Sequence, residues 1–168
     1  MAIQPAYREW KLDDVPQIQK VLYNTWVASY SEFIPLLDIQ WYFNNHYSEM
    51  DFAEMIEDPN VFSFVAEVKG HIVGYTRGKF KPEENKFYLE SLYILPEFQG
   101  NGIGRVLLKM AEEKGKSKGF DKVWLGVMVQ NTASLQWYKK LGFQFVEESP
   151  FAMGNTIVAH LIGYREIQ

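Results

Sequence analysis

The chain has 168 residues, and its 47% hydrophobic content is enough to bury the core of one domain without disulfides or metals. It has no cysteine, which excludes disulfides, cysteine nucleophiles and thiolate metal sites. Its net charge of -4 argues against a protein that binds nucleic acid by neutralising many phosphates. No apolar stretch approaches the ~20 residues of a membrane helix, and nothing marks the N-terminus for secretion. We therefore expect one cytoplasmic domain over residues 1–168, with no nucleic acid or membrane as partner.

The first third of the chain shows helical periodicity. A short strand over residues 6–10 is followed by a helix that has Asp13 at its N-cap and Pro16 in its first turn. Two further helices are expected over residues 36–47 and 48–56, each with one apolar face.

From residue 61 onward the pattern becomes that of a sheet. Residues 61–68 and 71–80 are rich in β-branched and aromatic residues, and Lys69-Gly70 between them predicts a hairpin turn. A polar loop separates this hairpin from a strand over residues 87–95, which Pro96 ends.

Helices and strands alternate in the remainder of the chain. The expected elements are a helix over 103–118, a strand over 122–129, a helix over 131–141, and strands over 143–147 and 157–164. Gly119 ends the first of these helices, whose inner face is predicted to carry Val106, Leu107, Met110 and Ala111. This order predicts a mixed α/β domain with antiparallel and parallel strand pairs.

The loop Gln99-Gly100-Asn101-Gly102-Ile103-Gly104 lies between a predicted strand and a predicted helix. The helix end leaves backbone N–H groups without partners, and the glycines let an anion approach them, while Gln99 and Arg105 add donors. The same run is also typical of a plain turn and helix start. A dinucleotide fingerprint and a P-loop are both disfavoured, because the run is G-x-G-x-G and ends in Gly104-Arg105-Val106.

Two motifs together carry a family resemblance. Gln99-x-x-Gly102-x-Gly104, before an amphipathic helix, resembles the cofactor signature of the GNAT superfamily of acetyl-CoA-dependent N-acetyltransferases. Further along, the segment Asn131-x-Ala133-Ser134-x-x-x-Tyr138-Lys139-Lys140-Leu141-Gly142-Phe143 is similar to the second signature of that family. The resemblance covers essentially the whole chain. It implies an acyltransferase with a central mixed, largely antiparallel sheet of about seven strands flanked by helices.

Within the superfamily, the segments that begin at Glu90 and at Trp124 look like the spermidine/spermine N-acetyltransferases, particularly the bacterial PaiA type. Phe151-x-Met153-Gly154 is similar to the C-terminal region of that type. This narrower resemblance implies a small-molecule amine acceptor, with a polyamine such as spermidine or spermine as the best match, and acetyl-CoA as the cofactor.

The resemblance also implies how the cofactor is held. Backbone groups of residues 92–94 would pair with the pantetheine arm, and the amides of residues 100–105 would hold the pyrophosphate. Asn131 is either an N-cap or a contact to the pantetheine arm. The implied cofactor-binding residues are Leu92, Tyr93, Ile94, Gln99, Gly100, Asn101, Gly102, Ile103, Gly104, Arg105, Asn131 and Ser134.

Acetyl transfer to an amine needs a proton acceptor for the amine and a proton donor for the leaving thiolate. Glu90, flanked by leucines in a predicted strand, is expected to be partly desolvated and matches the usual base of the family; the alternative is a salt-bridged strand carboxylate. Tyr138 matches the tyrosine that protonates the coenzyme A sulfur; the alternative is a packing role. A backbone N–H near Leu92 is the expected oxyanion donor.

The acceptor pocket is expected among the aromatic residues of the N-terminal helices. Trp26, Tyr30 and Tyr42, with Glu32 and Glu49, suit a polyamine through cation–π and ion-pair contacts. The alternative is that these aromatics fill a core or an oligomer interface, and a homodimer is compatible with them.

Other assignments stay open or are set aside. A peptide N-terminal acetyltransferase and a non-catalytic acyl-CoA-binding module are the competing functions. No metal is expected, because His46, His71 and His160 lack metal-ligand spacing and are interpreted as surface or core residues.

Overall fold

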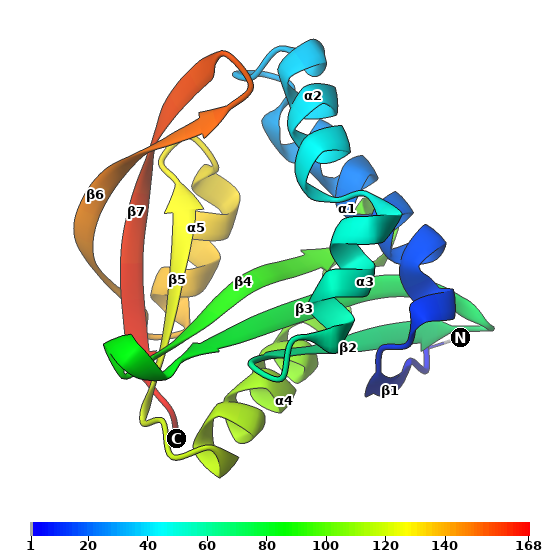
Figure 1. Ribbon diagram of the computed structural model, residues 1–168, viewed down its shortest axis with the longest axis vertical. Coiled ribbons are helices and arrows are strands. Elements are labelled where there is room, and N and C mark those ends of the chain that lie inside the picture. Colours follow the sequence, from blue (N-terminus) through cyan, green and yellow to red (C-terminus); the bar gives the residue numbers. More distant parts are fainter. Residues whose placement is uncertain (1) are drawn as a thin grey trace.

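A computed structural model describes residues 2–168 as one seven-stranded sheet flanked by helices, with the strand order β1-β2-β3-β4-β5-β7-β6 (Figure 1). The strands are β1 (Ala6–Glu9), β2 (Val61–Val68), β3 (His71–Lys81), β4 (Lys86–Ile94), β5 (Lys122–Met128), β6 (Gln144–Met153) and β7 (Thr156–Glu166). The helices are α1 (Val15–Tyr30), α2 (Leu36–His46), α3 (Glu49–Glu57), α4 (Ile103–Ser117) and α5 (Thr132–Lys140). Short 3₁₀ turns occupy Leu12–Asp14, Pro82–Glu84 and Pro96–Phe98. The predicted mixed α/β sheet is confirmed.

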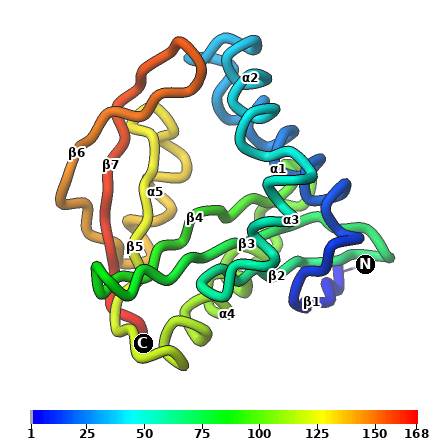
Figure 2. The backbone as a smooth tube through the Cα atoms, viewed as in Figure 1, coloured from blue at the N-terminus to red at the C-terminus, as the bar shows by residue number. Residues whose placement is uncertain are grey.

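The sheet consists of two halves, β1 to β4 and β5 to β7, which are joined, within residues 2–168, by a single residue pair between β4 and β5. Neighbouring strands are antiparallel except for β4 and β5, which run parallel and, among the described residues, pair only at Tyr88 and Trp124. Beyond that pair the two strands run apart, as Figure 2 shows. The divergence leaves backbone groups of both strands without a neighbouring strand.

Helices cover both faces of the first half of the sheet. α4 packs against β2, β3 and β4, and α1 packs against β3 and β4 from the other face, where α2 and α3 adjoin it (Figure 1). Ile18 and Leu22 of α1 and Leu107 and Leu108 of α4 are almost completely buried. Each such side chain contributes about 1.5–3 kcal/mol through apolar burial, so the two layers anchor the strand that borders the divergence.

The helix starts follow local chemistry, with one correction. α3 begins at Ser48 as predicted, where Ser48 and Asp51 form a reciprocal capping box. For α1 the predicted cap is wrong, because Asp14 and not Asp13 occupies the N-cap. The Asp14 carboxylate is buried and accepts a 2.7 Å hydrogen bond from Arg8 on β1. This ion pair fastens the start of α1 to the edge of the sheet.

Two other expectations are corrected. Val106 was placed on the inner face of α4 but is 38% exposed, whereas Ile103 is buried there. The strand predicted over 143–147 ended too early, because β6 continues to Met153 and includes Pro150. β6 is an edge strand, so a residue without an N–H is tolerated on its open side.

Candidate active site

A cavity of about 590 Å³ opens where β4 and β5 diverge. This volume lies in the range of small-molecule sites. The predicted residues that line it are Trp26, Tyr30, Tyr42, Glu90, Leu92, Tyr93, Ile94, Gln99, Gly100, Gly102, Ile103, Gly104, Arg105, Asn131, Ser134 and Tyr138. Among the predicted cofactor-binding residues, Asn101 is outside this lining, and its side-chain amide donates to the carbonyls of Phe98 and Gln99.

The glycine loop has the conformation that an anion site requires. Gly100 and Gly102 have φ angles of +79° and +80°, the left-handed region that favours glycine. Gly102 is the N-cap of α4, and no side chain caps the first-turn amides there. Those N–H groups, at the positive end of the helix dipole, remain free for a ligand. The loop therefore fits the pyrophosphate of an acyl-CoA.

The Gln99 side chain lines the cavity and also holds the end of β4. Its Nε2 donates a 2.9 Å hydrogen bond to the carbonyl oxygen of Ile94. The Ile94 carbonyl is thereby occupied as well. Arg105 is exposed and lines the cavity, so it is the cation available beside the loop.

The edge of β4 that faces β5 is open beyond Tyr88. On its other side β4 pairs with β3 as far as Ile94, so one edge is satisfied and the other is not. An extended ligand with amide groups can satisfy such an edge as an added strand does. The geometry fits a pantetheine arm along this strand.

A β-bulge places Glu90. Arg77 pairs with Ser91 and the next residue, Gly78, pairs with Leu89, so Glu90 is the extra residue on β4. Its carboxylate Oε2 lies 3.3 Å from Nη2 of Arg77, and its side chain is 33% exposed. The bulge and the ion pair hold this carboxylate, which is only partly exposed, at the cavity surface.

Arg77 is a buried cation beneath this wall, with 4% exposure. Its guanidinium carbon lies 5.4 Å from the centre of the Tyr47 ring, and Nη1 lies 2.9 Å from Sδ of Met55. Burial opposes its charge, but the neighbouring Tyr75, Tyr47 and Glu90 raise the pKa of Arg77 above its usual value. Glu90 therefore faces a permanent positive charge.

The start and the middle of α5 both reach the cavity. Tyr138 is 9% exposed and packs against Trp137 and Phe143, with ring centroids 5.0 Å and 5.3 Å away. Burial raises the pKa of the Tyr138 hydroxyl, so the phenol stays neutral and can donate a proton. Asn131 is the N-cap, accepting a hydrogen bond from the Ser134 amide, and it also lines the cavity.

Aromatic rings form the wall on the α1–α2 side. The Trp26 ring lies 5.8 Å from that of Tyr42 and 5.1 Å from that of Tyr47, and Tyr93 lies 6.2 Å away. Burial raises the pKa of Tyr42 to about 12, so its ring is neutral at physiological pH. Tyr30 lines the same wall. Such a wall offers several ring faces to a cation.

The acidic part of the predicted pocket is smaller than expected. Glu32 and Glu49 are exposed and do not line the cavity. Among residues 2–168, Glu90 is the only carboxylate in the lining. The lining on the side of the predicted acceptor pocket is therefore mainly aromatic.

The turn between β6 and β7 lies beside α2 (Figure 1). Asp38 of α2 accepts hydrogen bonds from the Asn155 amide, at 3.0 Å, and from Oγ1 of Thr156, at 2.6 Å. We call these three residues the α2 clasp. Nearby, the rings of Tyr42 and Phe151 meet with centroids 5.5 Å apart.

Several lining residues were not predicted as site residues, notably Ser91, Gly126, Phe151, His160 and Trp137. Phe151 and Trp137 lie within the two C-terminal segments that resemble family motifs, so the sequence could have indicated them. Ser91 and His160 had none, because a bulge and a strand pairing bring them to the cavity. Across residues 2–168 no group of three His, Cys, Asp or Glu side chains could hold a metal, and no helix is long and apolar enough to span a membrane.

Solved structures with the same fold include three acetyltransferases. The PaiA N-acetyltransferase of Thermoplasma acidophilum, in complex with coenzyme A, has a TM-score of 0.86 at 23% identity, covering 98% of this chain and 99% of that one. The spermidine N-acetyltransferase of Vibrio cholerae, in complex with CoA and spermine, gives 0.74 at 20%, covering 98% and 96%. The ribosomal-protein-S18-alanine N-acetyltransferase of Escherichia coli also gives 0.74, at 17%, covering 98% and 95%. At these identities the likeness shows the fold alone.

The family assignment comes from the sequence model described as the Acetyltransferase (GNAT) family, which matches residues 22–143. That match spans the aromatic wall, the bulged strand, the glycine loop and α5, all of which line the cavity. This chain therefore belongs to the GNAT family and is an acetyl-CoA-dependent N-acetyltransferase.

Proposed function

We propose that the acceptor is a small cationic amine, with a polyamine such as spermidine or spermine as the best candidate. The observation that carries the proposal is the aromatic wall of Trp26, Tyr30, Tyr42, Tyr47 and Tyr93, which ends at the Glu90 carboxylate. Each favourable cation–π contact contributes about 0.5–2 kcal/mol. A flexible chain with two or more ammonium groups gains several such contacts, whereas a monoamine gains fewer.

The proposed roles follow from position. Acetyl-CoA supplies the acetyl group as a thioester. The amides of residues 100–105 hold its pyrophosphate, and the open edge of β4 at Leu92 and Tyr93 holds the pantetheine arm. Glu90 accepts a proton from the amine, directly or through water, and Tyr138 donates one to the leaving sulfur.

A peptide acceptor is the competing candidate. The ribosomal-protein-S18-alanine N-acetyltransferase of Escherichia coli has the same fold, so the fold does not distinguish a peptide acceptor from a small amine. A peptide needs a groove that is open along its length. The α2 clasp ties the β6–β7 turn to α2, and the rings of Tyr42 and Phe151, which both line the cavity, are in contact. These contacts between α2 and β6 favour a compact pocket over an open groove, which supports a small molecule.

The test is coenzyme A release with a panel of acceptors, followed with a thiol-reactive chromophore. The chain has no cysteine, so the protein itself adds no background. The panel holds spermidine, spermine, a linear monoamine and a peptide with N-terminal alanine. We expect kcat/KM for the polyamines to exceed that for the monoamine by about tenfold, the value of one cation–π contact. Equal rates across the amines, or a preference for the peptide, would overturn the acceptor assignment.

A further inference from the structure

His160 occupies a place in the site that the sequence did not indicate. It lies on β7 between Met128 of β5 and Ser149 of β6, and its ring lines the cavity. Nδ1 is 2.7 Å from the carbonyl oxygen of Ser149. Because a carbonyl oxygen only accepts, Nδ1 carries the hydrogen of the neutral ring, and Nε2 is left with a free lone pair.

Gly126 of β5 provides the room for this ring. A Cβ atom at position 126 would lie 2.7 Å from Cδ2 and 3.2 Å from Nε2 of His160. The edge of the ring that carries Nε2 therefore lies over Gly126, and Phe151 packs against the ring at 5.6 Å. The glycine and the Ser149 carbonyl together fix where Nε2 is.

Nε2 lies on the same face of the sheet as Glu90, on the other side of the divergence. The paired residues Tyr88 and Trp124 share a face, because Nζ of Lys86 lies 6.0 Å and 4.3 Å from their rings. Glu90 lies two residues after Tyr88, and Gly126 lies two residues after Trp124. Because side chains alternate between the two faces of a strand, Glu90 and Gly126 lie on the same face as that pair. The carboxylate and the imidazole over Gly126 thus face the cavity from opposite strands.

Acetyl transfer to a protonated amine requires the removal of two protons from the nitrogen. A protonated amine loses one proton before its nitrogen can attack, and a second as the C–N bond forms and the C–S bond breaks. One proton goes to the sulfur, and one is released to solvent. A single carboxylate that is already paired with Arg77 would have to take both.

We propose that His160 is a catalytic residue that takes the first proton. Nε2 accepts it from the acceptor ammonium, the N–H electron pair stays on nitrogen, and the half-buried imidazolium passes the proton to solvent. Glu90 takes the second proton and restores the hydroxyl of Tyr138 after that residue has protonated the sulfur. The proposal rests on N-acetyl transfer and not on the choice of a polyamine.

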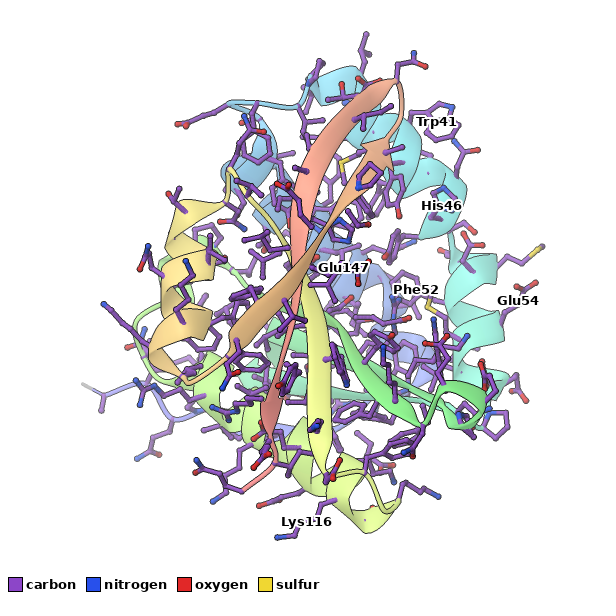
Figure 3. The ribbon with its side chains drawn as sticks, turned by 90° about the vertical axis from the view of Figure 1, so that its left-hand side faces the viewer. Trp41, His46, Phe52, Glu54, Lys116 and Glu147 are labelled. Atoms are coloured by element: carbon purple, nitrogen blue, oxygen red, sulfur yellow. The ribbon has the colours of Figure 1, made fainter. Side chains whose placement is uncertain are left out.

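Other titratable groups face the same region. They are Glu90 on β4, Glu147 on β6, which pairs with Ile162 on the face of His160, and Tyr42 on α2, which reaches this wall through Phe151. Figure 3 shows Glu147 on β6. All of them are unchanged in a variant at position 160, so a change in pH profile reports the imidazole.

The first test is His160→Gln, assayed with the amine that the wild-type protein acetylates fastest. If that amine is not a polyamine, the polyamine proposal fails, but the variant and the wild-type protein are still compared with the same substrate. We expect kcat/KM to fall about 100-fold, the lower end of the range for a general base, and the acid side of its pH profile to change. The affinity for acetyl-CoA in calorimetry should be unchanged. His71→Gln, at the exposed first residue of β3, is the matched control and should behave as wild type.

A second variant, Gly126→Ala, leaves His160 in place but moves its imidazole ring. In Gly126→Ala the added Cβ pushes the ring away, so we expect a partial loss of kcat/KM. In the double variant with His160→Gln that loss should disappear, because the two changes act on the same ring. An unchanged rate and pH profile in His160→Gln would overturn the proposal, and losses that multiply in the double variant would contradict the position of Nε2.

Discussion

The two walls of the cavity are built in different ways. The wall proposed for the cofactor comes from residues 89–105 with α5, and it offers mainly backbone groups: an open strand edge and the amides at the start of α4. The wall proposed for the acceptor comes from side chains on α1, α2, β4, β6 and β7, which are spread along the sequence. A backbone site depends on conformation, whereas a side-chain site depends on the identity of each residue. Substitutions should therefore separate the two.

The largest expected effect is on the backbone wall. Gly102→Glu should weaken acetyl-CoA binding about a thousandfold, because it adds a negative charge beside the pyrophosphate and disfavours a left-handed conformation that costs other residues about 1–3 kcal/mol. Gly119→Glu is the control, since Gly119 has a φ of +90° but ends α4 outside the cavity. Calorimetry on both variants distinguishes a lost anion site from a general backbone defect. Similar affinities in the two would contradict the loop assignment.

Tyr138→Phe should lower kcat about a hundredfold and leave the affinity for acetyl-CoA unchanged, because only the proton donor is removed. Burial raises the pKa of Tyr138, so its protonated form persists to higher pH than in an ordinary tyrosine. The wild-type rate should therefore show no alkaline decline from this group below pH of about 10. Tyr164→Phe, outside the cavity, is the control. A kcat for Tyr138→Phe equal to that of the control would return Tyr138 to a packing role.

Glu90→Gln tests the residue that lies between the walls. The amide keeps the size of the side chain but cannot take a proton, so kcat should fall about 100-fold. Glu83→Gln, exposed on the 3₁₀ turn before β4, is the control. Steady-state kinetics at saturating acetyl-CoA measure the effect. A change confined to the KM of the acceptor would mean that Glu90 binds the amine without accepting its proton.

Tyr42→Ala should affect the acceptor and not the cofactor. Loss of one aromatic face should raise the acceptor KM about tenfold, the upper range for a single cation–π contact, with unchanged acetyl-CoA affinity. Trp41→Ala is a matched control, because Trp41 is the preceding residue on α2, is 53% exposed and does not line the cavity (Figure 3). If both variants bind the acceptor equally well, the aromatic wall is not its site.

Asp38→Ala, which opens the α2 clasp, should have the smallest effect. We expect the thermal midpoint to drop by less than about 4 °C at neutral pH, with a modest rise in acceptor KM. Hydrogen bonds from Thr156 and Asn155 lower the pKa of Asp38, so its contribution is present above the ordinary value of about 3.9 and is lost as the pH falls through the folded-state pKa. The difference in melting temperature from wild type should therefore vanish in acid.

Asp13→Ala, exposed on the turn before α1, is the control. A difference that persists in acid would exclude the carboxylate as its source.

The backbone wall was largely predictable because its signals are local. Glycines that need positive φ angles, an asparagine N-cap and a proline after a strand all act within a few residues of their own position. The element order and the mixed sheet followed from periodicity for the same reason. The exceptions were an edge strand that continues through Pro150 and an N-cap shifted to Asp14 by the ion pair with Arg8 on β1.

What the sequence determined by itself, then, is the family, the sheet and the place of the glycine loop, since those depend on short-range conformation. Only the tertiary structure decided that Glu90 sits in a bulge against Arg77, that Tyr47, Phe151 and His160 reach the cavity, and that Glu32 and Glu49 do not. These outcomes depend on register and packing between strands and helices that lie far apart along the chain, and no local pattern specifies such contacts.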